Sequence, residues 1–170
     1  MYYKKTLIAL TIILGLLITS AQAKIEIKHW QVGSEWTSRA DGYLLTHDHP
    51  FKDKRLKLTL AGARVDSLYV SANVDKTRSS FLYFTMDSDH FEAVKDAVST
   101  KYSLTCEKST VTNAMGAKFT NEECSYTEDG DKLVIEKYNG KTSEMGLQIY
   151  NIKELDEWNK KDQAKTKSDI

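Results

Sequence analysis

Alternating hydrophobic and polar residues predict β-strands over much of the chain. Leu56, Leu58 and Leu60 alternate with polar residues, which predicts a strand with one buried face. In residues 81–84 both faces are apolar, so we expect the strand over residues 80–86 to be central or covered. The segments expected to form strands in this first half also include residues 24–32, where residues alternate, and residues 65–73.

A helical pattern follows over residues 89–101. Asp89 and Glu92 form a start that resembles a capping box, and apolar residues recur behind it at helical spacing. Three turn signals then divide residues 104–151 into four strands, which predicts a β-meander. The predicted fold class is α+β, with a mainly antiparallel sheet, one amphipathic helix, the four-stranded meander and a short C-terminal helix over residues 153–161.

The first 23 residues have the layout of a secretory signal peptide. Lys4 and Lys5 precede an apolar run over residues 7–18, and Ala21 and Ala23 supply the small residues of a cleavage site. The run has 12 residues, fewer than the roughly 20 that a membrane-spanning helix needs. We therefore expect cleavage after Ala23, with an uncleaved anchor as the alternative, and no stable membrane insertion afterwards. The expected destination is the periplasm of a Gram-negative source, or the exterior otherwise.

Composition and charge narrow the class of protein. The 170 residues are 41% hydrophobic and carry 24 basic and 24 acidic side chains. Such a chain is too apolar to be disordered and lacks the basic excess typical of nucleic-acid binding. Loss of residues 1–23 leaves 22 basic and 24 acidic residues, a formal charge of −2. Residues 24–161 are expected to form one domain, and residues 162–170 a charged flexible tail.

The predicted export favours a disulfide bond between the two cysteines. Oxidising compartments favour disulfides, and Cys106 and Cys124 have only one intramolecular pairing open to them. A turn centred near Met115 would place them opposite each other across a hairpin, because each lies nine residues from it. A bulge over residues 121–123 would shift that register by one. We predict a Cys106–Cys124 disulfide, with an intermolecular bridge or free thiols as alternatives.

The sharpest polar cluster contains His47 and His49, at the end of an expected strand before Pro50. On a strand the two imidazoles point to the same face and can supply two ligands to Zn²⁺ or Cu²⁺. The pair resembles part of a metallohydrolase ligand motif, but Phe51 and Lys52 stand where that motif has Asp and His. A metal site would also need a third ligand, so solvated polar residues are the simpler interpretation.

A local basic run follows this cluster. It could contact an anionic lipid, a glycan or an acidic partner, although an ordinary charged strand edge has the same composition. Tryptophans in the N-terminal half could form a binding face beside it, although core packing explains them equally well. The candidate interaction patch consists of Lys52, Lys54, Arg55, Lys57, Trp30 and Trp36.

Catalytic motifs are missing from the sequence. It has no nucleophile elbow, no zinc-protease motif, no phosphate-binding glycine loop and no C-x-x-C pair, so we predict binding rather than catalysis and no cofactor. The leading hypothesis is a small exported module that binds a protein or envelope component, such as an inhibitor, an immunity-type protein or an envelope accessory protein. One alternative is an exported metal-dependent enzyme or metal carrier using His47 and His49. The other is a lipid or small-ligand carrier, which needs an apolar cavity of about 300 Å³ between helix and sheet.

Overall fold

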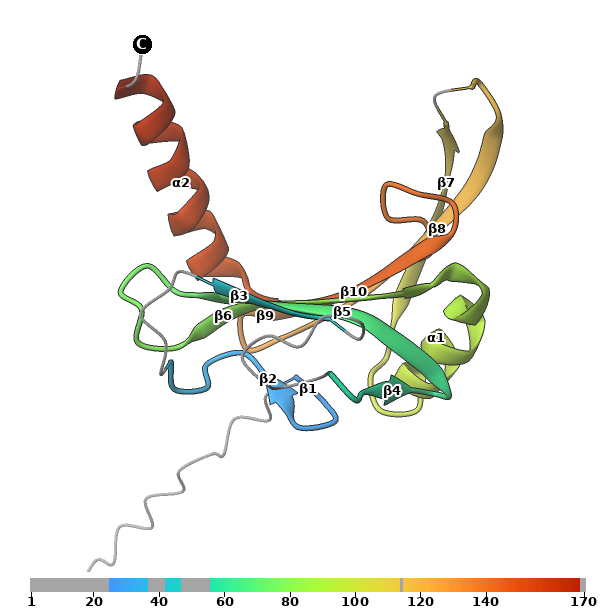
Figure 1. Cartoon of the computed structure of the whole chain (residues 1–170), viewed down its shortest axis with the longest axis horizontal. Helices are drawn as coiled ribbons and strands as arrows, with labels where there is room; N and C mark the ends of the chain where they lie inside the picture. The colour runs from blue at the N-terminus through green and yellow to red at the C-terminus, as the bar shows by residue number, and fades with distance from the viewer. Residues whose placement is uncertain (1–24, 37–41, 47–55, 114, 169–170) are drawn as a thin grey trace, which may run out of the picture.

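Antiparallel strands form most of the protein, as a computed structural model shows for residues 25–36, 42–46, 56–113 and 115–168. One large sheet and two helices give the α+β class that the sequence predicts. A short strand, β4 (Thr59–Leu60), pairs with β5 beside the main path. The order across the sheet is β3 (Gly42–Thr46), β5 (Ala63–Ala72), β6 (Ser79–Asp87), β10 (Glu144–Asn151), β9 (Asp131–Glu136), β8 (Lys118–Glu128) and β7 (Thr105–Thr112) (Figure 1).

Strands β7 to β10 are neighbours both in the chain and in the sheet. The turn between β8 and β9 consists of Asp129 and Gly130, with φ angles of 51° and 85°. A two-residue hairpin turn of type I′ needs a positive φ at both of its central residues, and Asp-Gly tolerates this conformation well. Strand β10 then returns beside β6, where Leu147 lies opposite Phe84, and joins the two halves of the sheet.

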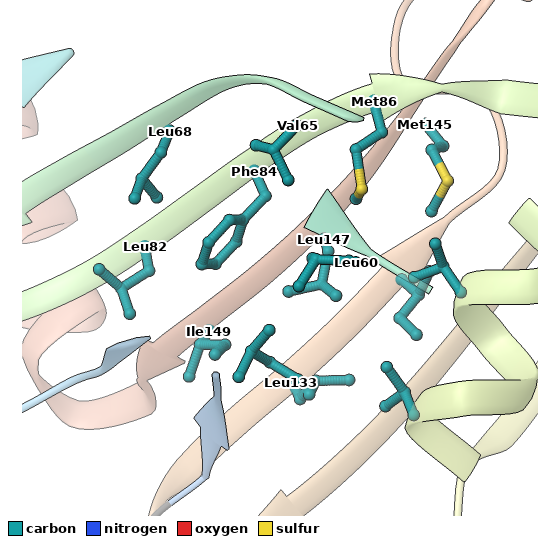
Figure 2. Packing of buried hydrophobic residues seen from close by; sticks show 14 of the residues in the cluster. Leu60, Val65, Leu68, Leu82, Phe84, Met86, Leu133, Met145, Leu147 and Ile149 are labelled. Carbon is teal, nitrogen blue, oxygen red and sulfur yellow. The ribbon is translucent and has the colours of Figure 1, made fainter. Parts of the chain in front are cut away.

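The two faces of the sheet differ sharply. Along β6, Leu82, Phe84 and Met86 are at most 1% exposed, whereas the residues between them are less deeply buried. Because neighbouring strands continue the same alternation, these side chains join one apolar layer, which we call the core face. Figure 2 shows this layer as Leu60, Val65, Leu68, Leu82, Phe84, Met86, Leu133, Met145, Leu147 and Ile149.

Helix α1 (Phe91–Ser99) covers one end of the core face. Phe91, Val94 and Val98 are buried, as their helical spacing predicts. The helix is shorter than the predicted 89–101 segment, because a 3₁₀ turn (Ser88–His90) precedes it. The capping residue also differs from the prediction. Asp87, rather than Asp89, caps this segment, because its carboxylate accepts a hydrogen bond of 2.9 Å from the Asp89 backbone N–H.

The N-terminal segment covers another part of the core face. The predicted strand over residues 24–32 is instead a small hairpin, β1 (Glu26–Ile27) and β2 (Trp30–Gln31). Lys28 reverses the chain at a φ of 59°, so the expected alternation stops there and His29 is exposed. In Figure 1 β1, β2, β4 and α1 lie on the same side of the sheet. Leu56, Leu58 and Leu60 are buried on this side, although only the last belongs to a strand.

Helix α2 (Ile152–Ser168) starts directly after β10 and rises from the opposite side of the sheet (Figure 1). Asn151 starts it, because its side-chain oxygen accepts a hydrogen bond from the Glu154 backbone N–H at 3.2 Å. The sequence predicts a helix ending at residue 161 and a flexible tail beyond it, but α2 continues to Ser168. Lysine, glutamine and alanine, which favour helices, are frequent in this extension.

The predicted Cys106–Cys124 disulfide is confirmed. The two residues lie directly opposite each other in the β7–β8 ladder, with their Cα atoms 3.9 Å apart. Cys124 is fully buried among core residues, whereas Cys106 is exposed. Strand β7 is the last strand of the sheet, and seven of its eight residues are exposed. The bridge therefore ties a strand with little core of its own to the body of the protein.

Candidate binding face

The side of the sheet opposite α1, which we call the open face, carries a group of aromatic residues. Phe81 is at its centre, with ring centroids 6.2–6.3 Å from those of three tyrosines. Such spacing is typical of aromatic rings in contact. The group spans three neighbouring strands, because β5, β6 and β10 are adjacent. We call it the aromatic tract, and it consists of Tyr69, Phe81, Tyr83 and Tyr150.

The tract is accessible despite its apolar character. Tyr69 is 38% exposed, and Phe81, Tyr83 and Tyr150 are half-buried. The sequence predicts a central or covered strand at residues 80–86, and β6 is indeed central between β5 and β10. The described residues do not fully cover its second apolar face, so these large aromatic side chains remain partly in contact with solvent.

Two glycines let tyrosines of the tract lie across neighbouring strands. A Cβ added at Gly146 would lie 2.9 Å from Cε2 of Tyr83, and one added at Gly42 would lie 2.7 Å from the Tyr69 hydroxyl. Both distances are shorter than van der Waals contact, so a larger residue would push the ring away. Tyr83 and Tyr69 therefore rest on the backbone at these glycines, and their rings lie flat against the sheet rather than standing upright from it.

The hydroxyl of Tyr83 is buried in the aromatic tract. Its oxygen has no hydrogen-bond partner among the described residues. Burial raises the pKa of Tyr83 to about 12, and the carboxylates of Glu144 and Glu136 add to the effect. The phenol therefore stays neutral at physiological pH, and it is available neither as an anion nor as a general base.

Small neutral residues surround the aromatic tract on the three central strands. Ser67, Ser71 and Thr85 accompany the aromatic residues, and the hydroxyls of Ser67 and Thr85 are 2.6 Å apart. Gln148 and Gly146 lie on the same face of β10. Charged residues lie beside this area, because Glu144 and Glu136 are close to Tyr83 and Lys132 is opposite Tyr150.

Helix α2 forms a wall at one side of the tract. Leu155 and Trp158 of α2 enclose, with Tyr69 and Phe81, a pocket of about 230 Å³. Trp158 is 49% exposed, which is high for tryptophan. The other residues that line the pocket are polar: Ser71, Ser80 and Asn159.

An ion pair fixes α2 beside the sheet. The Arg78 guanidinium donates a hydrogen bond of 2.7 Å to the Glu154 carboxylate, whose side chain is only 11% exposed. Asn151, immediately before the helix, also donates to Asp131 at 2.9 Å. These contacts involve only the first turn of α2, so they hold its start in place and leave the remainder to project from the sheet.

Most of the residues that the sequence singles out for binding cannot be placed relative to this face. His47, His49, Lys52, Lys54 and Arg55 lie outside the described residues. Lys57 is exposed.

Trp30 and Trp36 are half-buried and pack against the core, and the Trp36 ring stacks on Tyr43 with centroids 5.4 Å apart. Both tryptophans contact the core, as their alternative interpretation expects, and their part in a binding face stays a prediction.

Sequence reasoning missed most of the open face. Phe81 and Tyr83 were expected in a central or covered strand, and the short helix expected over residues 153–161, which contains Trp158, was assigned no binding role. The available signal was the alternation in residues 147–150, where Leu147 and Ile149 alternate with Gln148 and Tyr150. Such a strand exposes a polar and aromatic face while its other side is buried.

One possible ligand cluster for a metal occurs in the described part of the chain. Potential ligand atoms of Cys106, Glu122 and Cys124 lie within 4.8 Å of one another. Both sulfurs are joined in the disulfide, so they offer no thiolate in this form. Glu122 instead pairs with Lys95 of α1 at 2.9 Å, which assigns it to the packing of that helix.

Two other hollows occur in the described part of the protein. One, of about 260 Å³, separates α1 from β1 and is lined by Ile27, Val94 and Tyr102. It is smaller than the cavity of about 300 Å³ expected of a lipid or small-ligand carrier. The other, of about 610 Å³, lies between the β7–β8 hairpin and the β9–β10 loop, with Phe119 and Tyr138 among its lining residues.

Comparisons with known proteins do not assign this site. The chain has no significant match among protein-family models, curated proteins or solved structures. Within the described ranges, neither helix is long and apolar enough to cross a membrane.

Proposed function

We propose that this protein is an exported, non-catalytic binding module that holds its partner on the open face of the sheet. The observation that carries the proposal is the aromatic tract, where large rings remain accessible beside small neutral residues of the three central strands. Exposed aromatic patches in monomeric proteins mark interaction sites, because leaving them in water is unfavourable. In this protein the partner is a protein or a component of the cell envelope.

Export is the second part of the proposal. The layout of residues 1–23 supports it, and a disulfide between Cys106 and Cys124 is typical of proteins in oxidising compartments. The mature chain then begins at Lys24 and acts in the periplasm if the source is Gram-negative. In this proposal residues 24–161 form one α+β domain, with the helix at 89–101 and the four-stranded meander building the sheet that presents the binding face.

The alternatives have less support. A metal-dependent enzyme or carrier that uses His47 and His49 stays a prediction, since both residues lie outside the described ranges. A carrier that encloses a lipid or small ligand between helix and sheet is less favoured, because the hollow between α1 and β1 is smaller than the roughly 300 Å³ that an enclosed ligand needs. A binding face requires neither a metal nor a large cavity.

Covalent capture in the native compartment tests the proposal. A photoreactive amino acid in place of Gln148, on the open face, should crosslink a defined partner that co-purifies at near-equal stoichiometry. The same amino acid in place of Thr110, which is exposed on β7, is the matched control and should capture little. Equal capture from both positions, or repeated recovery of the protein alone, would contradict the proposal.

A further inference from the structure

We infer that the pocket between α2 and the aromatic tract is a subsite for one ring of a neutral saccharide, and that the tract continues it along a glycan chain. This inference rests on the proposed binding function of the open face and names its ligand class. It follows from three properties of the site: its aromatic walls, its lack of charge and its size.

The walls of the pocket suit a sugar ring. Trp158 and Leu155 approach from α2, while Tyr69 and Phe81 form the sheet side. The C–H bonds on a pyranose face carry slight positive charge, and the π-face of an aromatic ring is negative, so the two surfaces attract each other as they stack. Tyr69 rests over Gly42, which keeps its ring low on the sheet and leaves space above it.

The polar groups suit hydroxyls. Ser71 of β5 and Asn159 of α2 are among the residues that line the pocket, so hydroxyl and amide groups are close to the aromatic surfaces. A purely apolar ligand would take such groups out of contact with water, which costs binding free energy. A saccharide presents hydroxyls around its edge and C–H groups on its faces, and therefore matches both kinds of surface.

Charge distinguishes a neutral saccharide from an anionic one. The residues that line the pocket are uncharged, and the ion pair beside it, Arg78 with Glu154, is internally balanced. Charged side chains lie farther along the face: Glu144 and Glu136 are close to Tyr83, and Lys132 is opposite Tyr150. A phosphate, uronate or acidic peptide would find no cation in the pocket lining, which therefore favours a neutral ring.

The dimensions are those of one ring with an open continuation. At about 30 Å³ per water molecule, a pocket of about 230 Å³ has room for about eight waters, comparable to a single pyranose. Beyond the pocket, Phe81 is followed by Tyr150 and Tyr83 at ring separations of 6.3 and 6.2 Å. Further sugar units can therefore lie along the tract.

Titration of the purified exported protein with defined sugars tests this inference. The probes are cellotetraose, maltotetraose and chitotetraose, with tetragalacturonate as an anionic control. We expect at least one neutral tetramer to shift the NMR signal of the Trp158 indole N–H and to bind at least tenfold more tightly than tetragalacturonate. The Trp158→Ala variant should weaken binding at least tenfold, and Trp158→Phe should retain part of it.

The control variant is Met115→Ala, which removes another exposed apolar side chain, 89% accessible, from the tip of the β7–β8 hairpin. It should bind as the unmodified protein does. Unchanged thermal unfolding of Trp158→Ala would show that lost binding is not lost folding.

The inference is overturned if none of the neutral tetramers shifts the Trp158 signal, or if Trp158→Ala binds them normally. It is also overturned if the open face proves to join two copies of the chain in sedimentation experiments. If position 148 still crosslinks a protein while no saccharide binds, only the saccharide assignment fails and the proposed binding function stands.

Discussion

The two helices lie on opposite faces of one sheet, and they cover it to different extents. On the core face, α1 buries Phe91, Val94 and Val98, which are 1%, 1% and 8% exposed. On the open face, α2 leaves Trp158 49% and Ile152 36% exposed. The first helix completes a hydrophobic core, whereas the second only borders a surface.

The cause of this difference lies in the apolar spacing of each helix. In α1 the buried residues recur at i, i+3 and i+7 over most of its length, so one stripe faces the sheet. In α2 the large apolar residues are confined to the first two turns, and residues 159–168 are polar except for Ala164. Such a helix gains little free energy by packing along the sheet, because it has almost no apolar surface to bury there. An aromatic face stays open because its neighbouring helix lacks a stripe long enough to cover it.

The largest expected effect on stability comes from comparing two phenylalanines of β6, one on each face of the sheet. Phe84 is fully buried, so Phe84→Ala should lower the free energy of unfolding by about 3–5 kcal/mol. Phe81 points to the open face and is half-buried, so Phe81→Ala should cost only about 1 kcal/mol. Urea unfolding of both variants measures the difference. Equal losses would mean that the open face is covered like the core.

The disulfide should give the next largest effect. The bridge closes a separation of 18 residues, and replacing both Cys106 and Cys124 by alanine should cost about 3 kcal/mol. Because β7 has little core of its own, its amide hydrogens should exchange faster, while those of β6 change less. The control is reduction of the unmodified protein, which should reproduce the same pattern. Uniform acceleration across the sheet would contradict this account of β7.

A smaller effect tests how the tyrosines lie on the open face. In Gly146→Ala the new Cβ meets Tyr83 at 2.9 Å, which should lower the free energy of unfolding by about 1–3 kcal/mol. In a Tyr83→Ala background the clash is removed, and alanine should be neutral or slightly stabilising, since glycine weakens a strand. A double-mutant cycle by urea unfolding measures this coupling. The same cost in both backgrounds would show that the ring does not rest on Gly146.

The smallest expected effect concerns the ion pair that fixes α1. Lys95 pairs with Glu122 of β8 at 2.9 Å, with Glu92 and Lys108 also close. The hydrogen bond from Lys95 lowers the pKa of Glu122 below 4.5, although burial opposes this shift. Because the folded pKa is the lower one, the stabilisation is complete above pH 4.5 and is lost as the pH falls through the folded pKa.

The Glu122→Gln variant should therefore lose part of the acid dependence of unfolding below pH 4.5. Glu92→Gln is the control, because the Glu92 side chain is 61% exposed and should matter less. At the alkaline end, hydrogen bonds to Glu92 and Glu122 raise the pKa of Lys95. That stabilisation is present below pH 10.5 and is lost as the pH rises through the raised value. Identical acid profiles for Glu122→Gln and the unmodified protein would show that the pair does not fix α1.

Predictions that depend on nearby residues in the chain were the successful ones. The disulfide follows from a single hairpin turn, since Cys106 and Cys124 are equidistant from Met115. The burial of Leu56, Leu58 and Leu60 follows from alternation alone. In both cases the determining interactions act within one hairpin or one strand, so the sequence pattern contains them.

Predictions that depend on the arrangement of distant elements were less successful. Residues 25–32 form a hairpin that packs on the core face, because the chain reverses at Lys28. The local sequence contains no pattern that predicts this turn. The candidate site was missed for the same reason, because Tyr69, Phe81 and Trp158 are brought together from β5, β6 and α2. The sequence could show that residues 81–84 are apolar on both faces, but not which face a helix would cover.

The sequence by itself determined the α+β class, the alternation that separates core residues from their neighbours, and the disulfide partner of each cysteine. Those features arise from backbone periodicity and turn chemistry over short stretches of chain. Only the tertiary structure decided that α1 covers one face and that α2 leaves the other open. That outcome depends on how all helices and strands pack together, because the packing decides which apolar surfaces are buried. In this protein it leaves four aromatic residues accessible on one face: Tyr69, Phe81, Tyr83 and Tyr150.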